Sequence, residues 1–311
     1  ILSEDIFIVD HTNKVIEIQS GNWTFNNDII IPKGYKLECK NKTHITLNNS
    51  ASLIINGNIN FNGTAKFPIV VDSKDSTGSL FICQASGESN LSYVEFNGLS
   101  VPKNNKFNLT GGVSVYESDI KIANVLFTNN NSEDALNIVL SKFEISNTAF
   151  KEIKADAFDG DFSTGSVINT TFSKIGNDAL DFSGSIVFIQ EIDIKGVGDK
   201  GVSAGEKSYI YGDGIYITSS ELGIVSKDLS LIKLDNATLS KVSVPFAVFQ
   251  KKSEFGSAQL ILNNYSSKEF LEEFLIENGS KVSVNNRSLK PSHKDVISIL
   301  YGEKYGKRSI R

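Results

Sequence analysis

The sequence predicts an all-β fold, a parallel β-helix solenoid with about 22 residues in each coil, and three observations lead to it. First, aspartates recur at a nearly fixed period: Asp134, Asp156, Asp178 and Asp199 lie 22, 22 and 21 residues apart. Second, each is accompanied by short runs in which apolar and polar residues alternate, separated by Asn, Gly, Asp or Ser, as in strands joined by turns. Third, a repeat of this length is too short for paired helices and fits one coil of a β-helix.

Apolar residues at the same step predict which side chains fill the core. Two inward columns are expected to stack along the solenoid axis, namely Leu136, Phe158, Leu180 and Val202, and Ile138, Gly160, Phe182 and Ala204. A third column, of asparagines, is expected at a bend of the coil, at Asn124, Asn147 and Asn169. Stacked side-chain amides at a bend satisfy backbone groups that the turn leaves without partners.

The repeat pattern predicts one domain with a cap at each end, because an open coil would expose strand edges. Residues 1–290 are predicted to form a single parallel β-helix that includes an N-terminal cap. Residues 291–311 are predicted to form a C-terminal cap and tail, with a short helix in the segment DVISILYGEKYG. The polar stretch 103–110 is expected to be an extended loop.

The composition narrows the class of partner. A net charge of -5 and a pI of about 5.4 favour neither nucleic acid nor an anionic membrane surface. No apolar run reaches the roughly 18 residues that a membrane span needs, so no membrane insertion is expected. Cys39 and Cys83 are 44 residues apart, which predicts a separation of two coils. At about 9.6 Å they are too far apart for a disulfide, so free buried thiols are expected.

Four carboxylates are expected to crowd onto two adjacent coils, namely those of Asp156, Asp159, Asp178 and Asp181. Two unit charges about 4.8 Å apart repel by roughly 1 kcal/mol in water and by several-fold more at lower dielectric. Such a cluster needs a bound cation, a lysine or a retained proton to neutralise it. Oxygen ligands without a nearby His or Cys favour Ca²⁺ as the cation. The alternative is that these aspartates only cap turns through their own hydrogen bonds.

Over roughly residues 20–290 the repeats resemble right-handed parallel β-helix proteins of the pectate-lyase-like superfamily. Within them, ADAFDGDFS followed one coil later by NDALDFSGS is similar to the calcium site of family 9 polysaccharide lyases. The positions that match the calcium ligands of that family are Asp156, Asn177, Asp178 and Asp181. Asn177 stands where the family has an acid, and Lys200, in GDKG, is implied as the catalytic base. The repeats also resemble uncharacterised bacterial surface β-helix proteins, which imply no activity.

Lyase chemistry needs a cation beside the uronate carboxylate, a base, and positive groups that hold the sugar acid. Lys154, Lys207 and Lys227 are expected to bind the acidic polymer, because the arginines lie only near the C-terminal end. Tyr209 and Tyr211 lie just beyond the aspartate segments and are expected to stack on sugar rings. The alternative for Lys200 is that it pairs with an aspartate across the coil.

The leading hypothesis is therefore a secreted or cell-surface β-helix protein that engages an acidic polysaccharide and, as an enzyme, acts as a Ca²⁺-dependent lyase. Two other hypotheses for the function stay open. One is a non-catalytic structural or adhesive module whose Asp and Asn ladders only stabilise turns. The other is an inverting glycoside hydrolase that uses two aspartates about one coil apart. The repeats resemble polygalacturonase-type glycosidases in this respect, although Lys200 stands where that family has a histidine.

Overall fold

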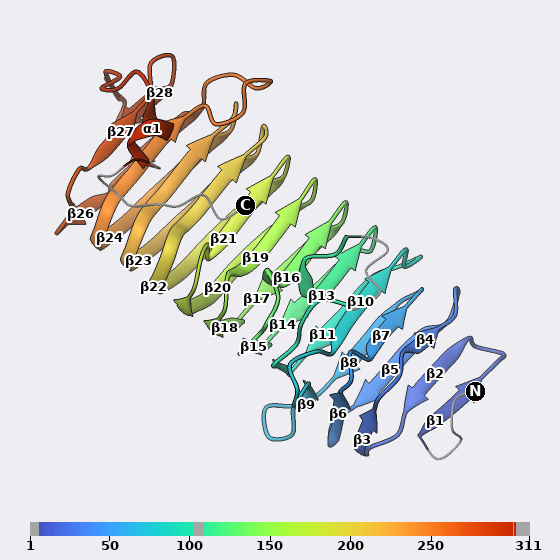
Figure 1. Ribbon diagram of the computed structural model, residues 1–311. Coiled ribbons are helices and arrows are strands. Elements are labelled where there is room, and N and C mark those ends of the chain that lie inside the picture. Colours follow the sequence, from blue (N-terminus) through green and yellow to red (C-terminus); the bar gives the residue numbers. More distant parts are fainter. Residues whose placement is uncertain (1–5, 103–107, 301, 303–311) are drawn as a thin grey trace.

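The computed structural model describes residues 6–102, 108–300 and 302, which form a β-solenoid of about 12 turns (Figure 1). Strands hold 63% of the residues and helix 2%, and successive turns are about 22 residues apart, so the right-handed parallel β-helix expected from the sequence is confirmed. Most of the expected loop 103–110 and the chain after Gly302 lie outside the described residues. Within the described ranges, no helix is long and apolar enough to span a bilayer.

Three parallel sheets, here called A, B and C in chain order, form the walls of the solenoid. Sheet A contains β2 (Val15–Ile18), β5 (Lys36–Lys40), β8 (Ile59–Asn62), β11 (Ser89–Ser92), β14 (Ile120–Ala123), β17 (Lys142–Ser146), the first parts of β20 (Thr164–Ile175), β22 (Ile186–Gly205), β23 (Tyr209–Lys227) and β24 (Leu231–Phe249), then β25 (Gln259–Asn263) and β28 (Lys281–Val284). Sheet B contains β3 (Gly21–Phe25), β6 (Thr43–Leu47), β9 (Ile69–Asp72), β12 (Val94–Asn97), β15 (Leu126–Thr128), β18 (Ala149–Ile153), later parts of β20, β22, β23 and β24, and β26 (Ser266–Lys268).

Sheet C is the wall on which the repeated aspartates lie. It contains β4 (Ile29–Ile31), β7 (Ser52–Ile55), β10 (Ser79–Cys83), β13 (Gly111–Tyr116), β16 (Asp134–Val139), β19 (Asp156–Asp161), β21 (Leu180–Ser183), the ends of β22, β23 and β24, and β27 (Phe274–Ile276). The first and last coils are closed by antiparallel pairing, of β1 (Phe7–Asp10) with β2 and of β29 (Arg287–Leu289) with β28. A short helix, α1 (Val296–Leu300), follows at the C-terminal end.

The core columns expected from the sequence are present. On sheet C, Leu136 pairs with Phe158, Phe158 with Leu180, and Leu180 with Val202, and all four side chains are fully buried. Sheet B carries a stack of four phenylalanines, Phe96, Phe127, Phe150 and Phe172, with ring centroids 5.1, 4.7 and 5.0 Å apart. These columns form because side chains at equal positions of successive coils lie one strand spacing apart, about 4.8 Å.

The asparagine column is also confirmed, and it lies at the corner between sheets A and B. Asn124, Asn147 and Asn169 all adopt a positive φ, between 48° and 57°, a left-handed conformation that asparagine tolerates better than most residues. The amide nitrogen of Asn169 donates a hydrogen bond to the side-chain oxygen of Asn147 at 2.6 Å. The column therefore fixes the bend and links successive coils.

A buried serine ladder, which the sequence reasoning missed, lies at the corner between sheets C and A. From Ser118 to Ser208, the backbone amide of each serine donates to the hydroxyl of the serine one coil later, at distances of 2.9 to 3.1 Å. Its members are Ser118, Ser141, Ser163, Ser185, Ser208 and Ser230. Their spacing of 22 or 23 residues was a readable signal in the sequence. The ladder satisfies backbone donors at each corner and so holds the coils in register.

The two cysteines are free and buried, as expected, but not for the expected reason. Cys39 lies in β5 of sheet A and Cys83 in β10 of sheet C, so they occupy different walls rather than one column. The expected two-coil separation assumed that the 22-residue period already held in this part of the chain. The coils lengthen between the two cysteines: Leu37 of β5 pairs with Ile59 of β8, 22 residues later, whereas Ser52 of β7 pairs with Ser79 of β10, 27 residues later.

Candidate functional site

The outward face of sheet C presents the repeated aspartates in parallel columns. In the first column Asp134 pairs with Asp156, and the pairing of Leu180 with Val202 sets Asp178 beside Lys200. The fourth member is therefore Lys200 and not Asp199, and the expected continuation of the column through Asp199 is wrong by one residue. The amide of Asp199 instead donates to the carbonyl of Asn177, at 2.9 Å. The 21-residue interval places Asp199 one position short of a 22-residue coil.

The second and third outward columns bring further carboxylates beside the first. The second column is Asn137, Asp159, Asp181 and Ser203, and the third contains Asp161 between Val139 and Ser183. Asp134 and Asp178 are buried, whereas Asp156, Asp159, Asp161 and Asp181 are partly exposed to solvent. The four partly exposed aspartates, here called the sheet C acids, are the ones that a ligand can reach.

Lys200 neutralises two of the carboxylates directly. Its Nζ lies 3.0 Å from Oδ2 and 3.2 Å from Oδ1 of Asp178, and 2.7 Å from Oδ2 of Asp199. The backbone amide of Lys200 also donates to Oδ1 of Asp178 at 3.0 Å. Two roles were expected for Lys200, that of a catalytic base and that of an ion-pair partner across the coil. These contacts correspond to the ion pair. An ammonium held in this way donates hydrogen bonds, and it would have to leave both carboxylates to act as a base.

Asp156 accepts hydrogen bonds from the turn of the next coil and also has a raised pKa. Its Oδ1 accepts hydrogen bonds from the backbone amide of Asp178 at 2.7 Å and from the side-chain amide of Asn177 at 2.6 Å. Burial, with the carboxylate of Asp178 as the next contribution, raises the pKa of Asp156 to about 7. A carboxyl group with this pKa holds its proton over much of the range in which ordinary aspartates are ionised.

The pKa values of the other sheet C acids are shifted in opposite directions. Burial and the nearby carboxylate of Asp181 raise the pKa of Asp161 to about 6, and burial also raises the pKa of Asp159. Burial acts in the same direction on Asp181, but the ammonium groups of Lys227 and Lys200 outweigh it and lower the pKa of this carboxyl. Asp181 therefore carries a charge at a pH where its neighbours hold protons.

Lys227 reaches Asp181 from two coils away, a contact that spacing alone does not reveal. Its Nζ lies 3.6 Å from Oδ1 of Asp181. Between them stands Gly205, where an added Cβ would lie 2.9 Å from Cε of Lys227. The missing side chain at Gly205 leaves the space through which the lysine extends. The sequence does carry a sign of this contact: the glycine of AGEKS, in the third column, is followed one coil later by the lysine.

The expected calcium ligands face protein donors. No group of three or more His, Cys, Asp or Glu side chains within residues 6–102, 108–300 and 302 is arranged to hold a metal ion. Asp156 accepts from Asn177 and Asp178, and both oxygens of Asp178 contact Lys200. Arranged in this way, these residues do not fit Ca²⁺, because its ligands must converge on one point at about 2.3–2.6 Å. The calcium site stays a prediction.

Calcium and Lys200 would compete for the same oxygens of Asp178, which makes the prediction testable. We expect millimolar Ca²⁺ to leave the Tm of the wild-type protein unchanged and to raise the Tm of Lys200→Met, whose carboxylates lack the ammonium. Binding at a hundred times Kd would stabilise that variant by about 2.7 kcal/mol. Thermal unfolding with Ca²⁺, with Mg²⁺ and with chelator checks this. A Ca²⁺-specific rise in the wild type would instead support the calcium site predicted from the sequence.

The expected polymer-binding residues do not gather on one face. Lys154 lies in the turn just before Asp156, and its Nζ contacts the side-chain oxygen of Asn131 at 2.9 Å. Lys207 is exposed in the turn between β22 and β23. Tyr209 and Tyr211 are exposed on the outward face of sheet A, around the corner from the sheet C acids. Lys154 and Lys207 therefore lie in turns at opposite edges of sheet C, the two tyrosines lie on another wall, and Lys227 contacts Asp181.

The C-terminal helix bounds the acidic surface. Beyond Lys200 and Ser203 the outward columns become apolar, and α1 packs on them through Val296 and Leu300. The residues that it covers are Leu222, Val225, Val244, Ala247 and Phe249. Leu222 is the register partner of Lys200, so the covered surface begins one coil after the lysine. The helix thus forms the C-terminal boundary of the candidate site.

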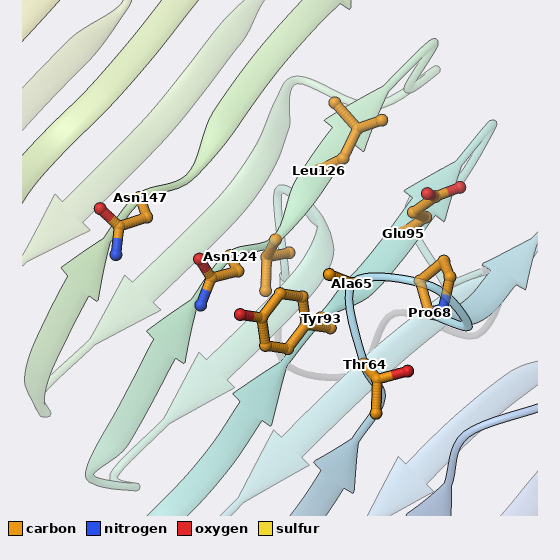
Figure 2. Close-up of a pocket in the computed structure, with 9 residues that line it drawn as sticks. Thr64, Ala65, Pro68, Tyr93, Glu95, Asn124, Leu126 and Asn147 are labelled. Atoms are coloured by element: carbon orange, nitrogen blue, oxygen red, sulfur yellow. The ribbon is translucent and has the colours of Figure 1, made fainter.

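A separate hollow of about 230 Å³ lies at the corner between sheets A and B, away from the carboxylates (Figure 2). Thr64, Ala65 and Pro68 line it from the loop before β9, and Tyr93 lies between this loop and the asparagine column. Asn124 and Asn147 of that column line the other side. Among the residues that line this hollow, Glu95 is the one titratable group besides Tyr93, so the hollow offers few groups for catalysis.

Comparison with known proteins agrees with the architecture. No protein-family model matches the chain, and no curated protein matches its sequence. The crystal structure of a mutant of the periplasmic alginate epimerase AlgG superposes with a TM-score of 0.51, at 10% identity, over 91% of this chain and 81% of that one. The chain is a parallel β-helix. At this identity the likeness to the epimerase establishes the fold alone.

Two further β-helix structures superpose less closely. Pectate lyase Pel9A gives a TM-score of 0.36 at 14% identity, over 84% of this chain and 76% of that one. The PL6 family alginate lyase AlyGC gives 0.44 at 14% identity, over 90% of this chain and 52% of that one.

Proposed function

We propose that this chain is a polysaccharide-processing β-helix protein whose sheet C acids act on the polymer by general acid–base chemistry. The observation that carries the proposal is the division of acidity on adjacent coils. The pKa of Asp161 is raised to about 6, whereas that of Asp181 is lowered. Neighbouring carboxyl groups with separated pKa values are suited to the roles of acid and base. Polysaccharide as the substrate class is supported by the fold, which an alginate epimerase shares.

The proposed roles follow from the contacts of each group. Asp161 is partly exposed and donates a proton to the oxygen of the glycosidic bond that breaks. Asp181, kept ionised by Lys227, accepts a proton from the attacking group. Asp159 is the register partner of Asp181 and lies two residues before Asp161, so it contributes to the same surface. Asp178 and Lys200 form the buried support beneath them.

This assignment favours hydrolysis over the calcium-dependent lyase that the sequence resemblance implies. A lyase of that kind needs Lys200 as its base, and Lys200 is held by Asp178 and Asp199. The two reactions leave different products: a lyase creates an unsaturated, ultraviolet-absorbing end, whereas a hydrolase creates only new reducing ends. A polymer-processing role also places the protein outside the cell or at its surface, which is part of the proposal.

Asparagine substitutions test the acid–base assignment. Asp161→Asn and Asp181→Asn are each expected to lower kcat by about 10²-fold or more on a polysaccharide that the wild type cleaves. Asp193→Asn serves as a matched control, because Asp193 is a partly exposed aspartate of sheet B that pairs with Lys195. Reducing-end release and ultraviolet absorbance, measured on pectate, alginate and neutral glucans, separate hydrolase from lyase.

The pH profile gives a second readout of the same assignment. A group with a raised pKa is protonated below it, so activity that needs protonated Asp161 should fall as pH rises through about 6. Activity that needs ionised Asp181 should fall only at acidic pH, below its lowered pKa. Asp161→Asn should abolish the alkaline decline. Cleavage that is unaffected by both substitutions, or no cleavage on any polymer, would contradict the proposed function and favour the structural module.

A further inference from the structure

We propose that the outward face of sheet A carries a second, non-catalytic binding site for a polysaccharide chain. Its centre, here called the aromatic patch, consists of Ile186, Phe188, Tyr209 and Tyr211, which are 36% to 46% exposed. Single exposed apolar residues are ordinary on a protein surface, but a contiguous set marks an interaction site. The choice of a polysaccharide as ligand rests on the proposed function.

The register of sheet A makes the aromatic patch continuous. Ile186 pairs with Tyr209, and Phe188 pairs with Tyr211, on the neighbouring strands β22 and β23. Residues paired in this way are about 4.8 Å apart, and residues two positions along a strand are about 6.6–6.8 Å apart. Three aromatic rings and one aliphatic side chain thus stand side by side on one wall. Such a surface presents flat apolar area with the tyrosine hydroxyls at its outer edge.

A hollow adjoins the patch and supplies hydrogen-bonding groups beside it. It has a volume of about 280 Å³, and its polar lining residues are Glu88, Asp119, Lys142, Glu144, Thr164 and Ser166. Thr164 pairs with Ile186 and Ser166 pairs with Phe188, so the hollow and the patch share a border. Hydroxyl, carboxylate and ammonium groups beside aromatic rings match a sugar, whose rings have apolar C–H faces and polar rims.

The size of the patch argues against a second copy of the chain as the ligand. Aromatic side chains bury 150–250 Å² each, so four side chains at less than half exposure offer on the order of 400 Å². A stable protein interface buries about 800 Å² on each partner. Charged residues also flank the patch, with Lys142 and Glu144 before it and Lys233 after Tyr211. A narrow chain along the face fits these limits better than a broad protein surface.

Removal of the two tyrosines tests the site. Tyr209→Thr/Tyr211→Thr keeps residues suited to a strand and is expected to weaken retention by soluble polysaccharide in affinity electrophoresis about ten-fold. Tyr216→Thr is the matched control, because Tyr216 is also in β23 and 45% exposed but faces outward from sheet B. Asp181→Asn is expected to bind as the wild type does. Unfolding curves confirm that each variant is folded.

The outcomes separate this site from the proposed catalysis. Cleavage of short oligosaccharides by Tyr209→Thr/Tyr211→Thr at the wild-type rate, with weakened polymer retention, supports a separate binding site. Loss of retention without any cleavage by the wild type supports the site and refutes the proposed enzyme. Wild-type retention by the double variant, equal weakening by Tyr216→Thr, or no retention of the wild type overturns the proposal. Conversion of a wild-type dimer to a monomer by the double variant, seen by light scattering, also overturns it.

Discussion

Replacement of Lys200 by methionine is expected to destabilise the protein by about 3–5 kcal/mol, measured as the free energy of unfolding in urea. The side chain of Lys200 is almost fully buried and contacts Asp178 and Asp199 at 3.0 and 2.7 Å. Methionine keeps much of the length of the side chain but leaves the buried carboxylate of Asp178 without its cation. The cost arises mainly from that unpaired charge, because its desolvation is no longer offset.

Two comparisons make this expectation specific to the buried pair. Lys195→Met removes an exposed ion pair with Asp193 and should cost at most about 1 kcal/mol. Lys200→Met/Asp178→Asn should recover much of the loss, because the second change removes the unpaired charge. A deficit equal to that of Lys195→Met would contradict the structural role of Lys200.

The second large effect is expected in the phenylalanine stack of sheet B. Phe150 is fully buried between Phe127 and Phe172, with ring centroids 4.7 and 5.0 Å away. Phe150→Ala should lower the free energy of unfolding by about 3–5 kcal/mol, because it removes buried apolar area and leaves a cavity that neighbouring coils cannot close. The hydrogen-bonded coils on either side are held about 4.8 Å apart, which limits their collapse.

Phe270→Ala is a suitable control for the stack, since Phe270 is exposed outside the core. It should change the free energy of unfolding by no more than about 0.5 kcal/mol. Phe150→Leu should lie between the two, because leucine fills part of the space. If Phe150→Ala proved as mild as the control, the core of the solenoid would be more compliant than continuous stacking implies.

Much of the fold was predictable because a solenoid repeats one set of neighbours. In a parallel β-helix, residues one coil apart are adjacent in space, so the period in the sequence becomes distance in the structure. This is why the columns through Leu136 and Asn124 were predicted correctly. The same reasoning was wrong by one residue at Asp199. Asp199 lies 21 residues after Asp178 and was assigned to the aspartate column, but Lys200 occupies that column position.

The 22-residue period shared by aspartates and apolar residues determined the coil length, the inward columns and the wall on which the sheet C acids lie. The tertiary structure alone decided how those acids are neutralised. Asp178 is paired with Lys200, a lysine two coils away helps to lower the pKa of Asp181, and burial raises the pKa of Asp161 to about 6. These outcomes depend on burial, on the space that Gly205 leaves open, and on the reach of flexible lysines. A repeat encodes which backbone positions are neighbours, but the environment of each side chain decides its pKa and therefore its charge.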